Sequence, residues 1–516
     1  MSNGIVMGPV LGFRGLKDGF WRTSALIVIK GDSNEPEIKI TAGDNQQIKN
    51  TAALLKSFNE FRVWRLNWQI EQTSKEQTVE YSINKGNVFR YVVPELDKPL
   101  RIAYGSCAGF SHPKYMKNVE DKNAMWNRLD QQHQKTPFHL MLMGGDQIYS
   151  DSIWEVVGSI KDWYHQSFKN RKKAPFTKDM DAEVERFYFN LYCERWAQKE
   201  VTSVMSQIPS LMMWDDHDIF DGWGSYPEEQ QDSKVFKGIY KHAREHFRLF
   251  QLQAKDDKDL GEATLLAERG FTYAYRIGDV AVVALDMRSE RTQDRVMSLE
   301  TWNEVQAWMY REVGSQTSPD GFAKRACKHL LLMSSIPVVY VNANMVEDAL
   351  GWLPGQQDLE DDFKDQWMSS SHQGERIRLI HRLLKFSQDT GCRVTIVSGD
   401  VHVAALGYIE STRNSQITDQ ANVINQLISS GIVHTPPNGL VVYLMEKVLG
   451  DKTEEVDRGI TAQMLKFPGT PKRFISARNW LSLTFDDKNR IWAEWHVENE
   501  KSPYTKVIHP TGTITS

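Results

Sequence analysis

The hydrophobic and polar positions of the chain follow different periods in different parts of the sequence. In residues 64–70 and 79–83 apolar and polar side chains alternate, which predicts half-buried strands. After about residue 98, short apolar runs are separated by stretches in which apolar residues recur every three or four positions. That succession is typical of buried strands separated by surface helices. We therefore predict a β-rich domain over residues 1–97 and an α/β domain over residues 98–516.

Within the second domain, the helical period predicts amphipathic helices around 237–253, 302–313 and 377–384. Alternation returns at 481–497, where two strands flank a turn. Residues 451–473 are polar and rich in turn formers, so we expect a loop at the edge of the domain. Periodicity does not place two long insertions, which span residues 150–210 and 340–375.

Five of the predicted buried strands end on side chains that can bind a metal ion or an anion. They end at Cys107, at Asp146 with Tyr149, at residues 215–218, at Asp286 with Arg288, and at Asp400 with His402. Open α/β sheets bind ligands at the carboxyl ends of their strands. Five strand ends that carry oxygen, nitrogen and sulfur ligands therefore predict a site for several metal ions.

The ligand types suggest which ions this site would hold. Carboxylates and imidazoles suit divalent ions, whereas a thiolate and a phenolate together favour a more Lewis-acidic ion such as ferric iron. A shared carboxylate such as Asp146 could bridge two ions about 3.5–4 Å apart. Two ions at that distance lower the pKa of a bridging water and bind an ester oxygen, as hydrolysis of a phosphoester requires.

Composition and charge exclude several other classes of protein. The 516 residues carry a net charge of -5, which argues against a general nucleic-acid binder. The four cysteines are far apart, which argues against a disulfide framework or a zinc ribbon. We find no targeting segment and no apolar stretch of about 18 residues that could span a membrane. We therefore expect a cytoplasmic protein in which Cys107 stays reduced.

Taken in order, the five motifs resemble those of the PhoD-like alkaline phosphatases, a branch of the calcineurin-like metallophosphoesterases. The motifs are Gly105-Ser-Cys107, Gly145-Asp146-x-x-Tyr149, Trp214-Asp-Asp-His217-Asp, Leu285-Asp-x-Arg288 and Ser398-Gly-Asp400-Val-His402. The similarity covers about residues 95–440. It implies a four-layer αββα sandwich preceded by a small antiparallel β-sandwich domain, and metal-dependent hydrolysis of phosphate mono- or diesters.

The resemblance also implies a set of metal ligands. Cys107, Asp146 and Tyr149 would hold ferric iron (Fe3+), and Asp400 and His402 would complete the cluster. Asp146 would also bridge to a divalent ion, with Ca2+ expected ahead of Mn2+, Mg2+ or Zn2+.

Four further residues take roles from the same resemblance. Asp216 stands where the wider superfamily has a ligating Asn, and Asp221 is a candidate ligand where some relatives have Asn. His217 would assist the leaving group, and Arg288 would lie near the phosphate of the substrate.

Alternative interpretations remain for several of these residues and for the function. Asp215 and Asp218 could cap the following segment or orient His217, and Arg288 could pair with Asp286 instead of substrate. A non-catalytic protein that binds phosphorylated ligands could keep the same fold. A dedicated phosphodiesterase or nuclease is a further alternative, for which the basic run at 169–173 is the clearest signal, although we interpret that run as a solvated loop.

Overall fold

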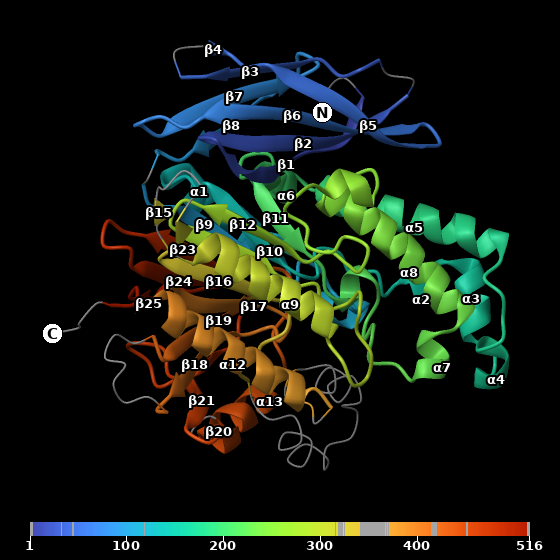
Figure 1. The fold of residues 1–516 in the computed structure, drawn as a ribbon. Helices are drawn as coiled ribbons and strands as arrows, with labels where there is room; N and C mark the ends of the chain where they lie inside the picture. Colours follow the sequence, from blue (N-terminus) through green and yellow to red (C-terminus); the bar gives the residue numbers. More distant parts are fainter. Residues whose placement is uncertain are drawn as a thin grey trace.

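The computed structural model describes residues 4–512 except for 32–33, 44–45, 97, 118, 315, 318–322, 325, 341–366, 368, 370, 414–420 and 450–451. Within these residues two large sheets pack face to face, and helices cover their outer faces (Figure 1). This confirms the four-layer αββα sandwich that the sequence resemblance implies.

The first large sheet mixes parallel and antiparallel neighbours. Its strands, in spatial order, are β25 (Tyr504–Ile508), β24 (Ile491–Val497), β23 (Asn479–Phe485), β9 (Arg101–Gly105), β10 (Leu140–Gly144), β11 (Ser210–Met213), β1 (Ile5–Lys17), β2 (Phe20–Lys30), β6 (Phe61–Glu71) and β5 (Asn50–Phe58). β9, β10 and β11 run parallel to one another, so their carboxyl ends meet at one edge of the sheet.

The second large sheet is built in the same way around a parallel centre. Its order is β12 (Tyr273–Ile277), β13 (Val280–Ala284), β16 (His329–Ser334), β17 (Arg393–Ser398), β19 (Val423–Ser429), β18 (Ala404–Ser411), β21 (Ile460–Leu465) and β20 (Glu454–Asp457), with β22 (Phe474–Ile475) on β18. β13, β16, β17 and β19 are parallel. Their carboxyl ends form a second row of positions for polar side chains.

Strand β10 shows how the sequence produces the layers. Successive side chains of a strand point to opposite faces, and all five residues of β10 are buried. Leu140 and Leu142 pack in the core between the sheets, whereas Met141 and Met143 pack under the outer helices. A strand that is covered on both faces has a continuous apolar sequence, which is the signal that predicted it.

The outer layers are helical. The helices that pack on the side of the first sheet are α1 (Ala124–Lys135), α2 (Ile153–Val156), α3 (Gly158–Tyr164), α5 (Lys178–Trp196), α6 (Lys199–Met205) and α8 (Lys234–His246). The short helices α4 (Phe168–Arg171) and α7 (Glu228–Gln231) contribute no buried residue. The helices on the side of the second sheet are α9 (Leu299–Trp308), α12 (Gln373–Thr390) and α13 (Gly439–Leu444). The helices predicted around 237–253, 302–313 and 377–384 are therefore confirmed. No helix among the described residues is long and apolar enough to cross a membrane.

The N-terminal strands are divided between two sheets. β1, β2, β6 and β5 continue the first large sheet, because β1 pairs with β11 through Gly12 and Ser210. The remaining strands form an N-terminal sheet of β4 (Gln46–Gln47), β3 (Ile38–Ala42), β7 (Gln77–Ile83) and β8 (Val88–Val93), which packs on the first (Figure 1). The antiparallel strands over 64–70 and 79–83 are confirmed, and the domain division at residue 97 stays a prediction.

One expectation about residues 451–473 is wrong. The segment contains β20 and β21, which pair with each other and with β18. Ile460, Ala462 and Met464 are buried and alternate with partly exposed residues, so the polar positions belong to the exposed face of a strand near the sheet edge. The insertion at 150–210 contains α2–α6, and most of the insertion at 340–375 lies outside the described residues.

Two glycines shape the turn that follows β10. A Cβ atom at Gly144 would overlap the hydroxyl and ring of the fully buried Tyr104 on the neighbouring strand β9. Gly145 has a φ of 105°, and a Cβ atom there would lie 2.8 Å from the Cβ of Asp215. The turn can therefore approach both neighbouring strand ends only because these two residues lack side chains.

We predict that Gly144→Ala lowers the free energy of unfolding by about 1–3 kcal/mol, because the added methyl group overpacks against a tyrosine that cannot move. Chemical denaturation of the two proteins measures the change. Gly158→Ala is the matched control: Gly158 lies in α3, and nothing is within 4 Å of the place that its new methyl group would take. This variant should therefore be as stable as the wild type or more stable. Equal stability of the Gly144 variant and the wild type would contradict the prediction.

Candidate active site

The predicted ligands converge at the carboxyl ends of parallel strands from both sheets. Cys107 follows β9 and Asp146 follows β10, whereas Asp400 and His402 follow β17. All four have positive φ values, of 53°, 55°, 69° and 54° respectively. Such backbone angles are uncommon for residues other than glycine and concentrate at functional sites. The strand ends are thus bent so that these side chains can meet.

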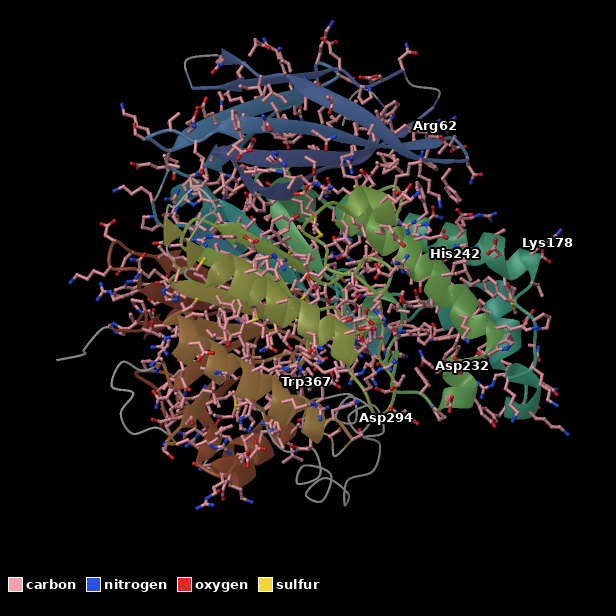
Figure 2. All side chains as sticks on the ribbon, in the orientation of Figure 1. Arg62, Lys178, Asp232, His242, Asp294 and Trp367 are labelled. Atoms are coloured by element: carbon pink, nitrogen blue, oxygen red, sulfur yellow. The ribbon has the colours of Figure 1, made fainter. Side chains whose placement is uncertain are left out.

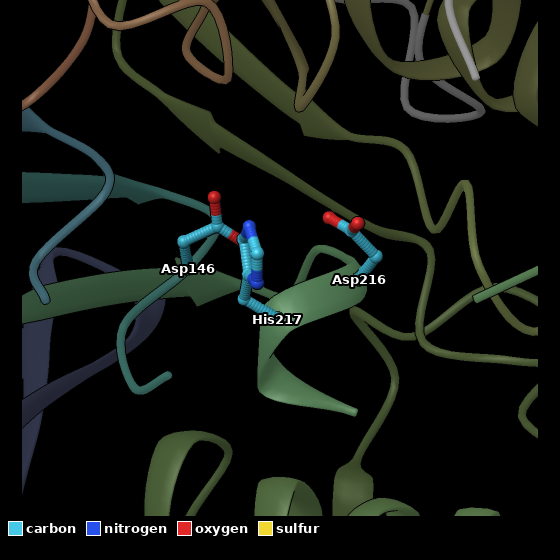
Figure 3. Close-up of side chains that lie close together, drawn as sticks. All are labelled: Asp146, Asp216 and His217. Carbon is cyan, nitrogen blue, oxygen red and sulfur yellow. The ribbon is translucent and has the colours of Figure 1, made fainter. Parts of the chain in front are cut away.

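Two groups of side chains have the spacing of a metal site. Asp146, Asp216 and His217 form one group, which Figure 3 shows, and Asp215, Asp216 and Asp400 form the other. Within each group one ligand atom per residue lies within 4.8 Å of the others. Asp216 belongs to both groups, so its carboxylate is placed between two potential ion positions.

Electrostatics at Asp146 indicate that a cation belongs in the first group. Its Oδ1 atom is buried and has no hydrogen-bond partner. Burial raises the pKa of Asp146 well above the usual range, and Asp215 and Asp216 raise it further against the opposing effect of His217. Buried carboxylates this close to one another require a positive charge to stay ionised. A divalent or trivalent ion supplies that charge, so the donor set fits a metal.

Cys107 lies beside this carboxylate. Its Sγ atom is 3.4 Å from Oδ2 of Asp146 and 3.0 Å from Oγ of Ser430. Burial raises the pKa of the Cys107 thiol well above its usual value, and the charge of Asp146 raises it further. The thiol is therefore neutral unless a metal ion deprotonates it, as coordination to a metal does.

Aromatic and imidazole rings form a stack on the other side of the cluster. The Tyr149 hydroxyl is 3.4 Å from Nε2 of His402, and the rings of His402 and His434 stack with centroids 3.7 Å apart. Burial lowers the pKa of His402 well below its usual value, and the pKa of His434 falls to about 3. Both imidazoles are therefore neutral, which is the form that binds metal. From the sequence His434 could line the pocket, but a lone histidine in a loop is usually solvated, so the sequence alone does not assign it to the site.

His217 is held by a residue that sequence analysis did not single out. Its Nδ1 atom is 2.9 Å from Oδ2 of Asp151, and its ring stacks on Tyr149 at 4.3 Å between centroids. Burial alone would lower the pKa of His217, but Asp151 and Asp216 outweigh it and raise that pKa well above the ordinary value. The protonated ring donates its Nδ1–H to Asp151, which sets the orientation of the ring. Only the position of Asp151, two residues after Tyr149, could have suggested this.

Asp218 has the structural role that the sequence favoured. It accepts hydrogen bonds from the backbone N–H groups of Asp215, Gln147 and Ile148 at 3.0, 3.4 and 3.2 Å, and from Nε2 of Gln251 at 2.8 Å. Its carboxylate therefore ties the turn after β10 to the turn after β11. Asp215, by contrast, both caps the following turn and joins the second acidic group.

Arg288 is fully buried and bound to carboxylates. Its guanidinium pairs with Asp215 through Nε and with Asp216 through Nη2, the latter at 3.2 Å. Asp286, the partner considered from sequence, accepts a hydrogen bond from the backbone N–H of Arg288 at 3.0 Å. The ion pair that we considered thus forms with two different acids, and these belong to the cluster.

Asp221 is adjacent to the cluster, because the backbone N–H of the next residue, Gly222, donates to Oδ2 of Asp216 at 2.7 Å. Asp221 itself is exposed, and its backbone N–H donates to Oδ1 of Asp151 at 2.8 Å. Among the described residues, neither group with metal-site spacing includes Asp221. Its role as a ligand stays a prediction.

The basic run at 169–173 contributes to the packing of the helical layer. The Arg171 guanidinium lies over the rings of Trp163 and Tyr164 at 5.8 and 5.2 Å. Lys172 forms a 2.7 Å ion pair with Glu229. These contacts give the run a structural role that does not require a nucleic acid.

Comparisons with known proteins identify a matching family and a relative in yeast. The family described as PhoD related phosphatase matches residues 101–353 and 351–454. An uncharacterized protein of Saccharomyces cerevisiae is 25% identical over 581 aligned positions, which cover 93% of this chain and 81% of the yeast protein.

Solved structures share the fold at low sequence identity. The structure of PhoD superposes with a TM-score of 0.60 at 13% identity, covering 99% of this chain and 91% of PhoD. A purple acid phosphatase from yellow lupin (Lupinus luteus) seeds gives a TM-score of 0.51 at 10% identity, covering 97% of this chain and 74% of that one.

We predict that Asp218→Asn destabilises the protein by about 2–4 kcal/mol, because an amide nitrogen would face N–H donors and leave two of them unpaired. Thermal unfolding with a parallel metal analysis tests this. The control is Asp232→Asn, a change at an exposed residue on the outer helical layer that Figure 2 labels, which should leave stability unchanged. A variant that loses metal but keeps its stability would show that Asp218 is instead a ligand.

Proposed function

The chain belongs to the PhoD-related phosphatase family, and we propose that it is a metal-dependent hydrolase of phosphate monoesters, diesters or both. The observation that carries the proposal is the buried acidic cluster, in which Asp216 is shared by two groups and Asp146 has an unpartnered oxygen. A site of this charge cannot bind an anionic ester unless cations are present. The family indicates a phosphate ester as the substrate, and in this proposal the ester binds after the metal ions have been loaded.

The residues at the strand ends would hold the metals. We assign ferric iron to Cys107, Asp146 and Tyr149, because a thiol and a phenol close to one carboxylate suit that ion. We assign Asp216 and Asp400 to the divalent position, and His402, which lies next to Tyr149, completes the cluster. When bound, the ions supply Lewis acidity at the phosphate and activate water.

The protein's own contribution to the chemistry is centred on His217. With Nδ1 held by Asp151 at 2.9 Å, the Nε2 proton is the one available to the departing alkoxide. The raised pKa keeps the ring protonated until that oxygen develops charge. Asp151 is a positioning residue here, because it acts through His217.

Arg288 contributes to the cluster rather than directly to the substrate in this proposal. Its pairs with Asp215 and Asp216 balance part of the negative charge and hold both carboxylates in place. The phosphate contact implied by the family resemblance would require these pairs to open, at the cost of leaving buried charges unpaired.

We predict that His217→Ala lowers turnover about 10²–10⁴-fold with metal content nearly unchanged, because the leaving group loses its proton donor. Asp151→Asn should keep the metals, lower turnover less, and shift the basic limb of the pH–rate profile to lower pH, since the neutral amide no longer raises the pKa of His217. Steady-state kinetics on mono- and diester substrates, with metal analysis, measures both. Loss of metal in His217→Ala would make His217 a ligand and defeat the proton-donor assignment.

The wild type decides between the proposal and its main rival. Metal-loaded protein that turns over neither a mono- nor a diester would support a phosphoryl-ligand binding protein.

We predict that protein purified without chelator is coloured, because a phenolate bound to ferric iron absorbs visible light by charge transfer. Tyr149→Phe should shift or abolish the band, since the phenyl ring keeps its packing against His217 but cannot coordinate. Absorption spectroscopy with iron analysis measures this. A colourless, fully active enzyme that contains only divalent metal would contradict the iron assignment and leave the hydrolase proposal intact.

A further inference from the structure

A large cavity lies on a different part of the molecule. Its volume is about 950 Å³, and its walls come from β1, β2, β5 and β6 of the first sheet, from β12, and from residues 308–312. None of the cluster residues lines it. In Figure 1 these N-terminal strands form the upper part of the molecule, with β12 beneath them.

The cavity is strongly basic, in contrast to the protein as a whole. The charged residues that line it are Arg14, Lys17, Arg22, Lys49, Arg276, Arg311, Glu262 and Glu312. Glu262 is 92% exposed at the side chain and makes only a 3.6 Å contact with Lys17, so it screens little of the charge. The net charge of this wall thus favours an anion.

Two of the arginines come from neighbouring strands of the first sheet. Arg14 lies on β1 and Arg22 on β2, beside a register shift between the pairs Phe13–Thr23 and Leu16–Trp21. Phe13 and Trp21 face the core shared with the N-terminal sheet, whereas Arg14 and Arg22 line the cavity. Both arginines therefore bring positive charge to the same cavity.

Neither arginine has a carboxylate of its own within the described part of the chain. Arg22 is half-buried, forms no hydrogen bond or ion pair with any described residue, and has a buried Nε without a partner. Arg14 donates to the carbonyl of Leu252 at 2.8 Å. The charge of Asp259 acts on Arg14, but this carboxylate is already held at 2.9 and 3.0 Å by the two terminal nitrogens of Arg65. Unpaired, partly desolvated guanidiniums are costly without a ligand.

We propose that this cavity binds a small ligand with two or more phosphate groups, held by the guanidiniums of Arg14 and Arg22. Phosphate oxygens accept paired N–H donors from arginine, and Asn67 and Gln69 line the same wall with amide donors. The volume fits a small organic molecule, for which pockets of about 300–1,000 Å³ are usual. The site is separate from the metal cluster and does not depend on the catalytic proposal.

The test is calorimetric titration of inorganic tripolyphosphate into the full-length, metal-loaded protein and into Arg22→Gln. The glutamine keeps a polar side chain but removes the charge, and the dissociation constant should rise about tenfold or more, as the loss of a charged hydrogen bond predicts. Arg90→Gln is the matched control. Arg90 lies on β8 outside the cavity, is exposed, and pairs with Glu80 at 2.7 Å, so its variant should bind like the wild type.

Thermal unfolding distinguishes a ligand-binding role of Arg22 from a structural role. Without ligand, Arg22→Gln should unfold at the same temperature as the wild type or a higher one, because a buried guanidinium nitrogen without a partner is removed. Tripolyphosphate should raise the unfolding temperature of the wild type more than that of the variant. A destabilised Arg22 variant, or equal affinity in the two proteins, would overturn the proposal. So would binding that disappears in Asp146→Asn but persists in Arg22→Gln, since the ligand would then occupy the metal cluster.

Discussion

The accumulation of buried negative charge at the strand ends is the constraint on which the rest of the structure depends. Asp146, Asp215, Asp216 and Asp400 converge within two overlapping groups, where Arg288 and His217 supply positive charge. Carboxylates this close in a low-dielectric interior repel one another. Burial opposes ionisation of Asp216, but Arg288 and His217 outweigh it and lower its pKa, whereas the pKa of Asp146 is raised well above its usual value. The cluster thus has the carboxylates and the charge that suit metal ions.

The fold meets that constraint through backbone geometry. Parallel strands bring several carboxyl ends to one edge, and the positive φ values of Cys107, Asp146 and Asp400 turn their side chains into a common volume. Asp218 accepts hydrogen bonds from the turn after β10 and from the turn after β11. A change in the backbone of one turn should therefore also move the metal-binding candidates of the other.

The sequence predicts the buried strands and the polar residues at their ends for one physical reason, whereas the four layers are implied by the family resemblance. Strands buried on both faces are short, continuous apolar runs, and the polar residue that ends such a run stands out, as Asp146 and Asp400 do. Asp151 and His434 carry no such signal, because each lies in an irregular loop and its role depends on a partner distant in sequence. The prediction for β21 is wrong for a different reason. Ile460, Ala462 and Met464 are buried and alternate with exposed positions, but the polar residues of the segment made it resemble a loop.

Pairing partners are a further property that periodicity does not encode. The alternation of residues 64–70 predicts a half-buried strand. It does not predict that the sheet of this strand continues through β1 to β11. That continuation gives the N-terminal strands a face directed at β12, and on this face Arg14 and Arg22 sit. The net charge of -5 is thus the sum of regions of opposite sign, which include the acidic cluster and the basic cavity. An anion can approach the acidic cluster only when metals reverse its sign, whereas the basic cavity attracts anions by its own side chains.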